Sequence, residues 1–138
     1  MRRAFTILTL VLLLGACSGK VEFKRPSSDE EIRQKLPGTY LVKVDYPGGN
    51  SRGTTTFTPQ GGLFTKLALT RSNETRNVFY EGYWQVQDGF LFTTVTNTDN
   101  TEVRAAVGHT NQLKIVSLDE HELVYQTRKS SPIYLRRQ

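Results

Sequence analysis

From Gly38 onward, short runs rich in β-branched and aromatic residues alternate with clusters of Gly, Pro, Asn and Asp. Such runs are typical of β-strands, and such clusters are typical of the turns between them. The pattern predicts eight or nine strands, at residues 40–46, 53–58, 63–70, 77–87, 90–96, 103–107, 113–118, 122–128 and 133–135. Short strands at this regular spacing predict an all-β domain, either an antiparallel sandwich or an antiparallel barrel.

The run from Asn77 to Gln87 shows the clearest alternation of apolar and polar positions. Successive side chains of a strand point to opposite faces. One face carries Val78, Tyr80, Gly82, Trp84 and Val86, and the other carries Glu81, Gln85 and Gln87. We therefore expect Trp84 in the core and a bend or bulge at Gly82. The Asp88-Gly89 pair that follows predicts a tight hairpin to the next strand.

A short helix is predicted just before the first strand. Ser28 is a good N-cap residue, and Glu31 three positions later completes a capping box. Ile32 and Leu36 lie four residues apart, so they share one face of this helix. Pro37-Gly38 predicts where the helix ends.

The chain begins with the basic residues Arg2 and Arg3, followed by an uncharged and strongly apolar run over residues 4–16. A membrane-spanning helix needs about 20 apolar residues, so this run has the length of a signal-peptide core instead. Its end, Leu14-Gly15-Ala16-Cys17, resembles the lipobox of bacterial lipoproteins. A buried N-terminal helix and a plain secreted protein are the alternatives.

The lipobox resemblance implies that residues 1–16 are removed as a signal peptide and that Cys17 is acylated as the first residue of the mature protein. Residues 17–27, rich in Gly, Ser, Pro and charge, would then form a lipidated tether, and residues 28–138 a single domain. Ser18 after the cysteine favours the outer membrane over the inner membrane, with the domain on the periplasmic side. The membrane is therefore an expected partner, through the acyl chains at Cys17.

Four segments of the domain, taken in order, resemble a group of small lipocalin-like proteins, many of them bacterial lipoproteins. These segments are residues 36–40, 57–64, 81–91 and 115–123. Lipocalins carry a Gly-x-Trp motif near the first strand, and Gly38-Thr39-Tyr40 places a tyrosine at the tryptophan position. The resemblance implies a small antiparallel up-and-down barrel, a short N-terminal helix at one end, a site for an apolar ligand inside, and no catalysis.

The aromatic residues divide into two candidate surfaces. If the barrel has an open mouth, the inward set lines a ligand pocket. The members of that set are Tyr40, Phe57, Tyr80, Trp84 and Phe92. Phe79 and Tyr83 fall on the opposite face of their strand, beside Glu81, and would form an exposed aromatic patch. That patch is a candidate surface for a protein partner.

The sequence offers no arrangement of residues that is typical of catalysis. It has no Gly-rich phosphate loop and no Gly-x-Ser-x-Gly motif, and His109 and His121 fall in predicted turns without partners at ligand spacing. The net charge of +5 is scattered along the chain, which argues against nucleic acid as a partner. The pairs Arg128-Lys129 and Arg136-Arg137 are expected in solvent, or against an anionic surface. We expect neither an enzyme nor a metal or cofactor site.

Two functions from different classes remain. The first is non-catalytic binding of an apolar or amphipathic small molecule inside the barrel. The alternative is a structural or assembly role, in which the domain is a pilotin-like or accessory adaptor of an envelope complex and binds a protein through the aromatic patch. An enzyme is the third and least supported hypothesis, because no group of residues favours it.

Overall fold

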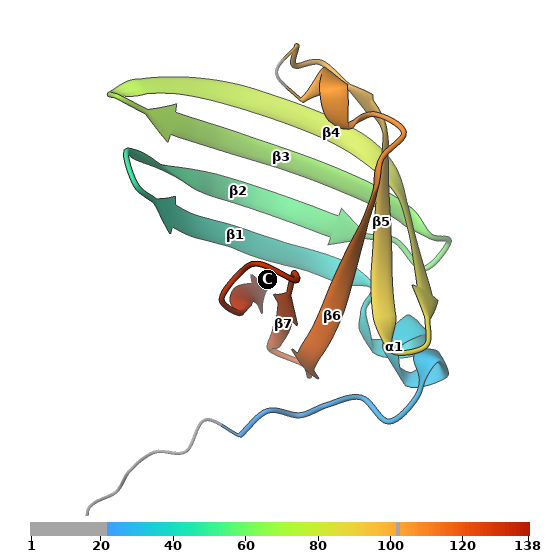
Figure 1. The fold of residues 1–138 in the computed structure, drawn as a ribbon. Helices are drawn as coiled ribbons and strands as arrows, with labels where there is room; N and C mark the ends of the chain where they lie inside the picture. The colour runs from blue at the N-terminus through green and yellow to red at the C-terminus, as the bar shows by residue number, and fades with distance from the viewer. Residues whose placement is uncertain (1–21, 102) are drawn as a thin grey trace, which may run out of the picture.

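The computed structural model describes residues 22–101 and 103–138. These residues form a closed barrel of eight antiparallel strands, with one α-helix before the first strand (Figure 1). Helix α1 spans Asp29–Lys35, and the strands are β1 Gly38–Tyr46, β2 Gly49–Phe57, β3 Gly62–Arg71, β4 Glu74–Gln87, β5 Phe90–Thr98, β6 Thr110–Leu118, β7 Glu122–Gln126 and β8 Ile133–Arg137. Each strand pairs with the next along the chain, and β8 pairs with β1. The expected all-β barrel is confirmed, and a sandwich is excluded.

Helix α1 lies where the capping pattern predicts it, directly before β1, and not at the N-terminus of the chain. The Ser28 hydroxyl accepts a hydrogen bond from the Glu31 N–H at 3.1 Å, so the predicted N-cap is confirmed. The Glu31 carboxylate accepts from the N–H and the hydroxyl of Ser27 rather than from Ser28. The reciprocal bond therefore falls one residue earlier than a capping box predicts.

The two backbone features predicted for β4 are both confirmed. Asp88 and Gly89 have φ angles of 53° and 77°, as a two-residue hairpin turn between right-twisted strands requires. The β4–β5 register shifts between Glu81 and Gly82, which is a bulge. A side chain at Gly82 would place its Cβ 1.8 Å from the carbonyl oxygen of Thr94, so this close approach of two strands requires glycine.

The prediction of a strand at residues 103–107 is wrong. Its place is taken by a 3₁₀ turn, η1, over Arg104–Ala106, and Val107 alone makes an isolated bridge to Val95. The segment carries two adjacent alanines, which favour helical turns and have only a methyl group to pack on a pleated surface. The ladder from β5 passes directly to β6, where Thr94 pairs with Thr110.

The barrel is tightly packed at the end that α1 covers. Ile32 and Leu36 are almost fully buried there, against a cluster of three aromatic rings. The ring of Phe57 makes edge-to-face contacts with Tyr40 at 5.8 Å and with Trp84 at 6.3 Å between centroids. Such pairs add about 0.5–1.5 kcal/mol beyond the burial of their area. Trp84 therefore lies in the core as expected.

Strands β1 and β8 close the barrel with two assigned pairs, Tyr40 with Arg137 and Leu41 with Arg136. The other neighbouring strands share between four and ten pairs. Past Leu41, β1 continues to Tyr46 with no assigned partner on β8 among the described residues. The wall of the barrel is therefore held least firmly along this seam.

Candidate functional site

A cavity of about 410 Å³ occupies the barrel beyond the aromatic cluster, and all eight strands contribute to its lining. Phe57, Leu63 and Leu135 separate it from the packed end. Its other lining residues are Val42, Val44, Ser51, Thr55, Thr65, Leu67, Tyr80, Thr93, Val95, Asn111, Gln112, Leu113, Tyr125, Thr127 and Ile133. A concave, mostly apolar space of this size, with a few polar groups, is typical of a small-molecule site.

The lining of the cavity carries no Asp, Glu, Lys, Arg or His residue among the described residues. Its titratable groups are the phenols of Tyr80 and Tyr125. Burial, with a smaller contribution from the neighbouring Tyr80, raises the pKa of Tyr125 to about 12. The hydroxyls of Thr55 and Thr65 share one hydrogen bond at 2.8 Å inside the wall. The site is therefore uncharged at neutral pH.

The structure brings together some of the predicted pocket residues and separates others. Phe57 and Tyr80 line the cavity as expected. Tyr40 and Trp84 also point inward, but they lie in the packed cluster and do not reach the cavity. Phe92 was assigned to the wrong face: it pairs with the exposed Gln85, while its neighbour Leu91 pairs with the buried Val86 and points inward.

Several cavity residues escaped the sequence reasoning, and Tyr125 is the most informative. Strand β7 alternates inward at Leu123 and Tyr125, and Tyr125 pairs with the inward-facing Ile115. Because every second side chain of a β-strand points to the same face, this alternation could have predicted that Tyr125 points inward. The same alternation applies to Val42 and Val44 on β1. Short strands give only two or three positions per face, so their inward face is harder to recognise than that of β4.

The packed end is closed by Arg137 rather than left to apolar contacts. The Arg137 guanidinium lies 4.9 Å above the Tyr40 ring and donates to the Tyr40 hydroxyl and the Pro37 carbonyl, both at 2.8 Å, and to the Lys35 carbonyl. The Tyr40 hydroxyl donates in turn to the Leu36 carbonyl at 2.8 Å. Burial raises the pKa of Tyr40 to about 12, although the nearby Arg137 cation opposes the shift. Arg137, expected in a solvated basic pair, is thus a structural residue.

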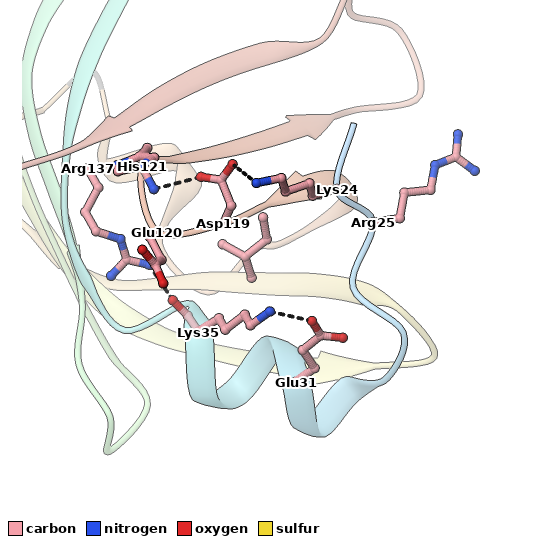
Figure 2. A pocket seen from close by; sticks show the side chains of 9 residues that line it. Lys24, Arg25, Glu31, Lys35, Asp119, Glu120, His121 and Arg137 are labelled. Carbon is pink, nitrogen blue, oxygen red and sulfur yellow. Dashed lines mark hydrogen bonds and ion pairs between the residues drawn. The ribbon is translucent and has the colours of Figure 1, made fainter. Parts of the chain in front are cut away.

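A second hollow, of about 580 Å³, lies outside the barrel beside α1 (Figure 2). Its charged side chains are largely paired with one another. Lys35 binds Glu31 at 2.6 Å, and Lys24 lies 3.9 Å from Asp119. The hydrogen bond from Lys35 is the main reason that the pKa of Glu31 falls to about 2. This hollow is larger than the cavity, but it is an open surface on which two ion pairs already hold four of the charged side chains.

The predicted aromatic patch lies on the outer face of the barrel. Tyr83 is 45% exposed, and Phe79 is half-buried against Lys66, its partner across β3 and β4. Phe64 on β3 is 42% exposed and joins them, which the sequence reasoning missed. Outward placement of Phe79 and Tyr83 is therefore confirmed, whereas their role in binding a partner stays a prediction.

The predicted lipidation site, Cys17, and the signal sequence lie outside the described residues. The end of the expected tether is described, and it is attached to the barrel: the Lys24 N–H donates to the Ser117 hydroxyl, and the Leu118 N–H donates to the Lys24 carbonyl, both at 2.9 Å. Within residues 22–101 and 103–138 there is no helix long and apolar enough to cross a membrane, and no group of three metal-ligating side chains.

A scan of protein-family models gives no match for this chain, and a search of curated proteins gives none either. What the protein does must therefore be inferred from its own residues and their arrangement.

Proposed function

We propose that this chain is a lipid-anchored envelope protein with a lipocalin-like barrel that binds an apolar or amphipathic small molecule without catalysis. The observation that carries the proposal is the uncharged, mostly apolar cavity of about 410 Å³ inside the barrel. A closed ring of eight strands has an interior just wide enough either to be filled by side chains or to hold one small ligand. In this barrel, side chains fill the half of the interior beside α1, and the other half contains the cavity.

The lipobox at Cys17 and the attachment of Lys24 support an orientation for the anchored protein. Lys24 lies seven positions after Cys17, and an extended chain over seven positions spans at most about 25 Å. Lys24 binds the end of β6, next to the β6–β7 turn, on the side of the barrel where α1 lies (Figure 1). The packed end would therefore face the anchoring membrane, and the cavity would open toward the periplasm.

The ligand-binding proposal is tested by native mass spectrometry of the mature chain, with Cys17→Ser and a cleavable export signal. We expect an additional mass that is lost on denaturation. Leu67→Trp fills the cavity from its wall and should abolish the additional mass. The matched variant Lys66→Trp adds the same bulk to the outer face and should retain it. An additional mass that survives in Leu67→Trp would place the ligand elsewhere and refute the proposal.

The anchor is tested separately, by labelling cells with a radioactive or clickable palmitate. The full chain should incorporate the label and separate with the outer membrane, and Cys17→Ser should do neither. Incorporation that persists in Cys17→Ser would contradict acylation at this residue.

An adaptor role is the second candidate, and the outer patch of Phe64, Phe79 and Tyr83 favours it. Exposed aromatic side chains on adjacent strands are characteristic of protein interfaces. We expect Phe79→Ser with Tyr83→Ser to remove any specific envelope protein that crosslinks to the anchored chain. Unchanged crosslinking in this double variant would exclude the patch as the binding surface.

A further inference from the structure

Two phenol hydroxyls in the cavity have no hydrogen-bond partner among the described residues. They belong to Tyr80 on β4 and Tyr125 on β7, which both line the cavity. The other buried or half-buried tyrosines differ: the hydroxyls of Tyr40 and Tyr46 donate to backbone carbonyls. Both side chains are half-buried and line an uncharged cavity, so their hydroxyls are suited to bond a ligand held there.

The chemistry of the cavity determines which ligand group fits these hydroxyls. Because Tyr125 keeps its proton to about pH 12, it is a hydrogen-bond donor at any physiological pH. The lining offers no cation to neutralise a carboxylate or a phosphate. Burying an ionised group without a partner costs several kcal/mol or more, whereas a neutral oxygen costs much less.

We propose that the bound molecule is neutral and largely apolar, and carries a carbonyl oxygen that accepts hydrogen bonds from Tyr80 and Tyr125. This inference rests on the proposed function, because it names the chemistry of a ligand for the same cavity. It separates esters, ketones and amides, which the cavity accepts, from fatty acid anions, which it rejects.

The test is calorimetric titration of the mature chain, Cys17→Ser, with three probes of similar bulk: 2-nonanone, octanoate and butylbenzene. We expect 2-nonanone to bind at least about tenfold more tightly than octanoate. Tyr125→Phe and Tyr80→Phe should each weaken 2-nonanone about two- to tenfold and leave butylbenzene unchanged. The matched control Tyr83→Phe removes a hydroxyl from the outer face and should change neither probe.

An infrared spectrum gives a second and independent measure. The carbonyl band of bound 2-nonanone should lie at lower frequency than in alkane solvent, and the shift should shrink in the double variant Tyr80→Phe, Tyr125→Phe. Butylbenzene binding to that variant shows that it is folded. If the probes bind but octanoate equals 2-nonanone, or the tyrosine variants change nothing, the carbonyl inference is wrong and the binding function stands. If no probe binds the chain in which both tyrosines are intact, the carbonyl inference and the proposed binding function are both wrong.

Discussion

The same eight strands build two halves of the barrel that use their side chains in opposite ways. In the half covered by α1, three aromatic rings with Ile32 and Leu36 fill the interior, Arg137 covers the end, and the Tyr40 hydroxyl bonds to protein partners. In the other half the inward side chains leave a cavity, and the Tyr80 and Tyr125 hydroxyls have no described protein partner. One end of the barrel therefore supplies stability, and the other end supplies space.

Tyrosine shows the difference most directly, because both halves place one on an inward face. Tyr40 is fully buried and its hydroxyl joins Leu36 to Arg137. The Tyr80 ring lines the cavity and its hydroxyl bonds to no described residue. A residue type thus has no fixed role in this protein, since the partner of its polar atom decides whether it holds the fold or faces a ligand.

The largest expected effect compares a leucine from each half. Leu91→Ala removes a fully buried side chain beside the packed end and should lower the free energy of unfolding by about 3–5 kcal/mol. Leu67→Ala removes a side chain that already borders the cavity, so it creates little new enclosed space and should cost only about 1–2 kcal/mol. Urea unfolding measures both. Equal losses would mean that the cavity half is packed as tightly as the other.

Alkaline pH should weaken both halves, because burial raises the pKa of Tyr40 in the packed half and of Tyr125 in the cavity half to about 12. The Tyr40 phenol of the unfolded chain titrates near pH 10, whereas burial holds it protonated to about pH 12 in the folded chain. Stability from this residue is therefore complete below pH 10, falls between pH 10 and 12, and changes by about 2–3 kcal/mol in total. Unfolding measured against pH tests this, and Tyr40→Phe should remove the part of the fall that comes from Tyr40 while the part from Tyr125 remains. A fall of the same size in Tyr40→Phe would assign it to other groups.

Removing a hydroxyl should destabilise one half and not the other. Tyr40→Phe leaves the Leu36 carbonyl and one Arg137 N–H without their partner and should cost about 1–3 kcal/mol. Tyr80→Phe removes a hydroxyl without a described protein partner and should change stability by less than about 0.5 kcal/mol. The thermal unfolding midpoints of the two variants measure these losses of stability. Similar losses in both variants would contradict the division between the halves.

The smallest difference is expected between two surface carboxylates. Asp29→Ala removes the acceptor of two N–H groups in the β4–β5 turn, at 2.9 and 2.7 Å, and should cost about 1–2 kcal/mol. Asp45→Ala removes an exposed ion pair with Arg52, which should contribute less than about 1 kcal/mol despite its 2.6 Å distance. Urea unfolding in low and high salt separates the two. An Asp45→Ala loss above that of Asp29→Ala would reverse the comparison.

Much of the fold could be predicted because the determining signals are local. The alternation of apolar and polar residues predicted β4, the Asp88-Gly89 pair predicted the hairpin turn after it, and Gly82 predicted the bulge. The error at Phe92 was avoidable in principle: a two-residue turn places Gln87 opposite Phe90, and counting along both strands brings Phe92 opposite the outward Gln85. The order of the strands around the ring was not encoded locally and came from the family resemblance alone.

The contacts that define the two halves could not be predicted, because they join distant residues. Arg137 meets Tyr40 across 97 positions, and Asp29 meets the β4–β5 turn across about 60. A basic pair such as Arg136-Arg137 looks solvated in any local pattern, since nothing near it shows that one guanidinium covers a tyrosine ring. The cavity is equally non-local, because its shape depends on all eight strands together.

The short seam between β1 and β8 has a consequence for the order of folding. The hairpins from β1 to β4 join residues close in the chain, so the entropy cost of closing their loops is small and they are expected to form early. The two pairs of the seam join residues almost a hundred positions apart and provide little ladder to offset that cost. Ring closure is therefore expected as a late step of folding, and the cavity acquires its complete wall only once that step is finished.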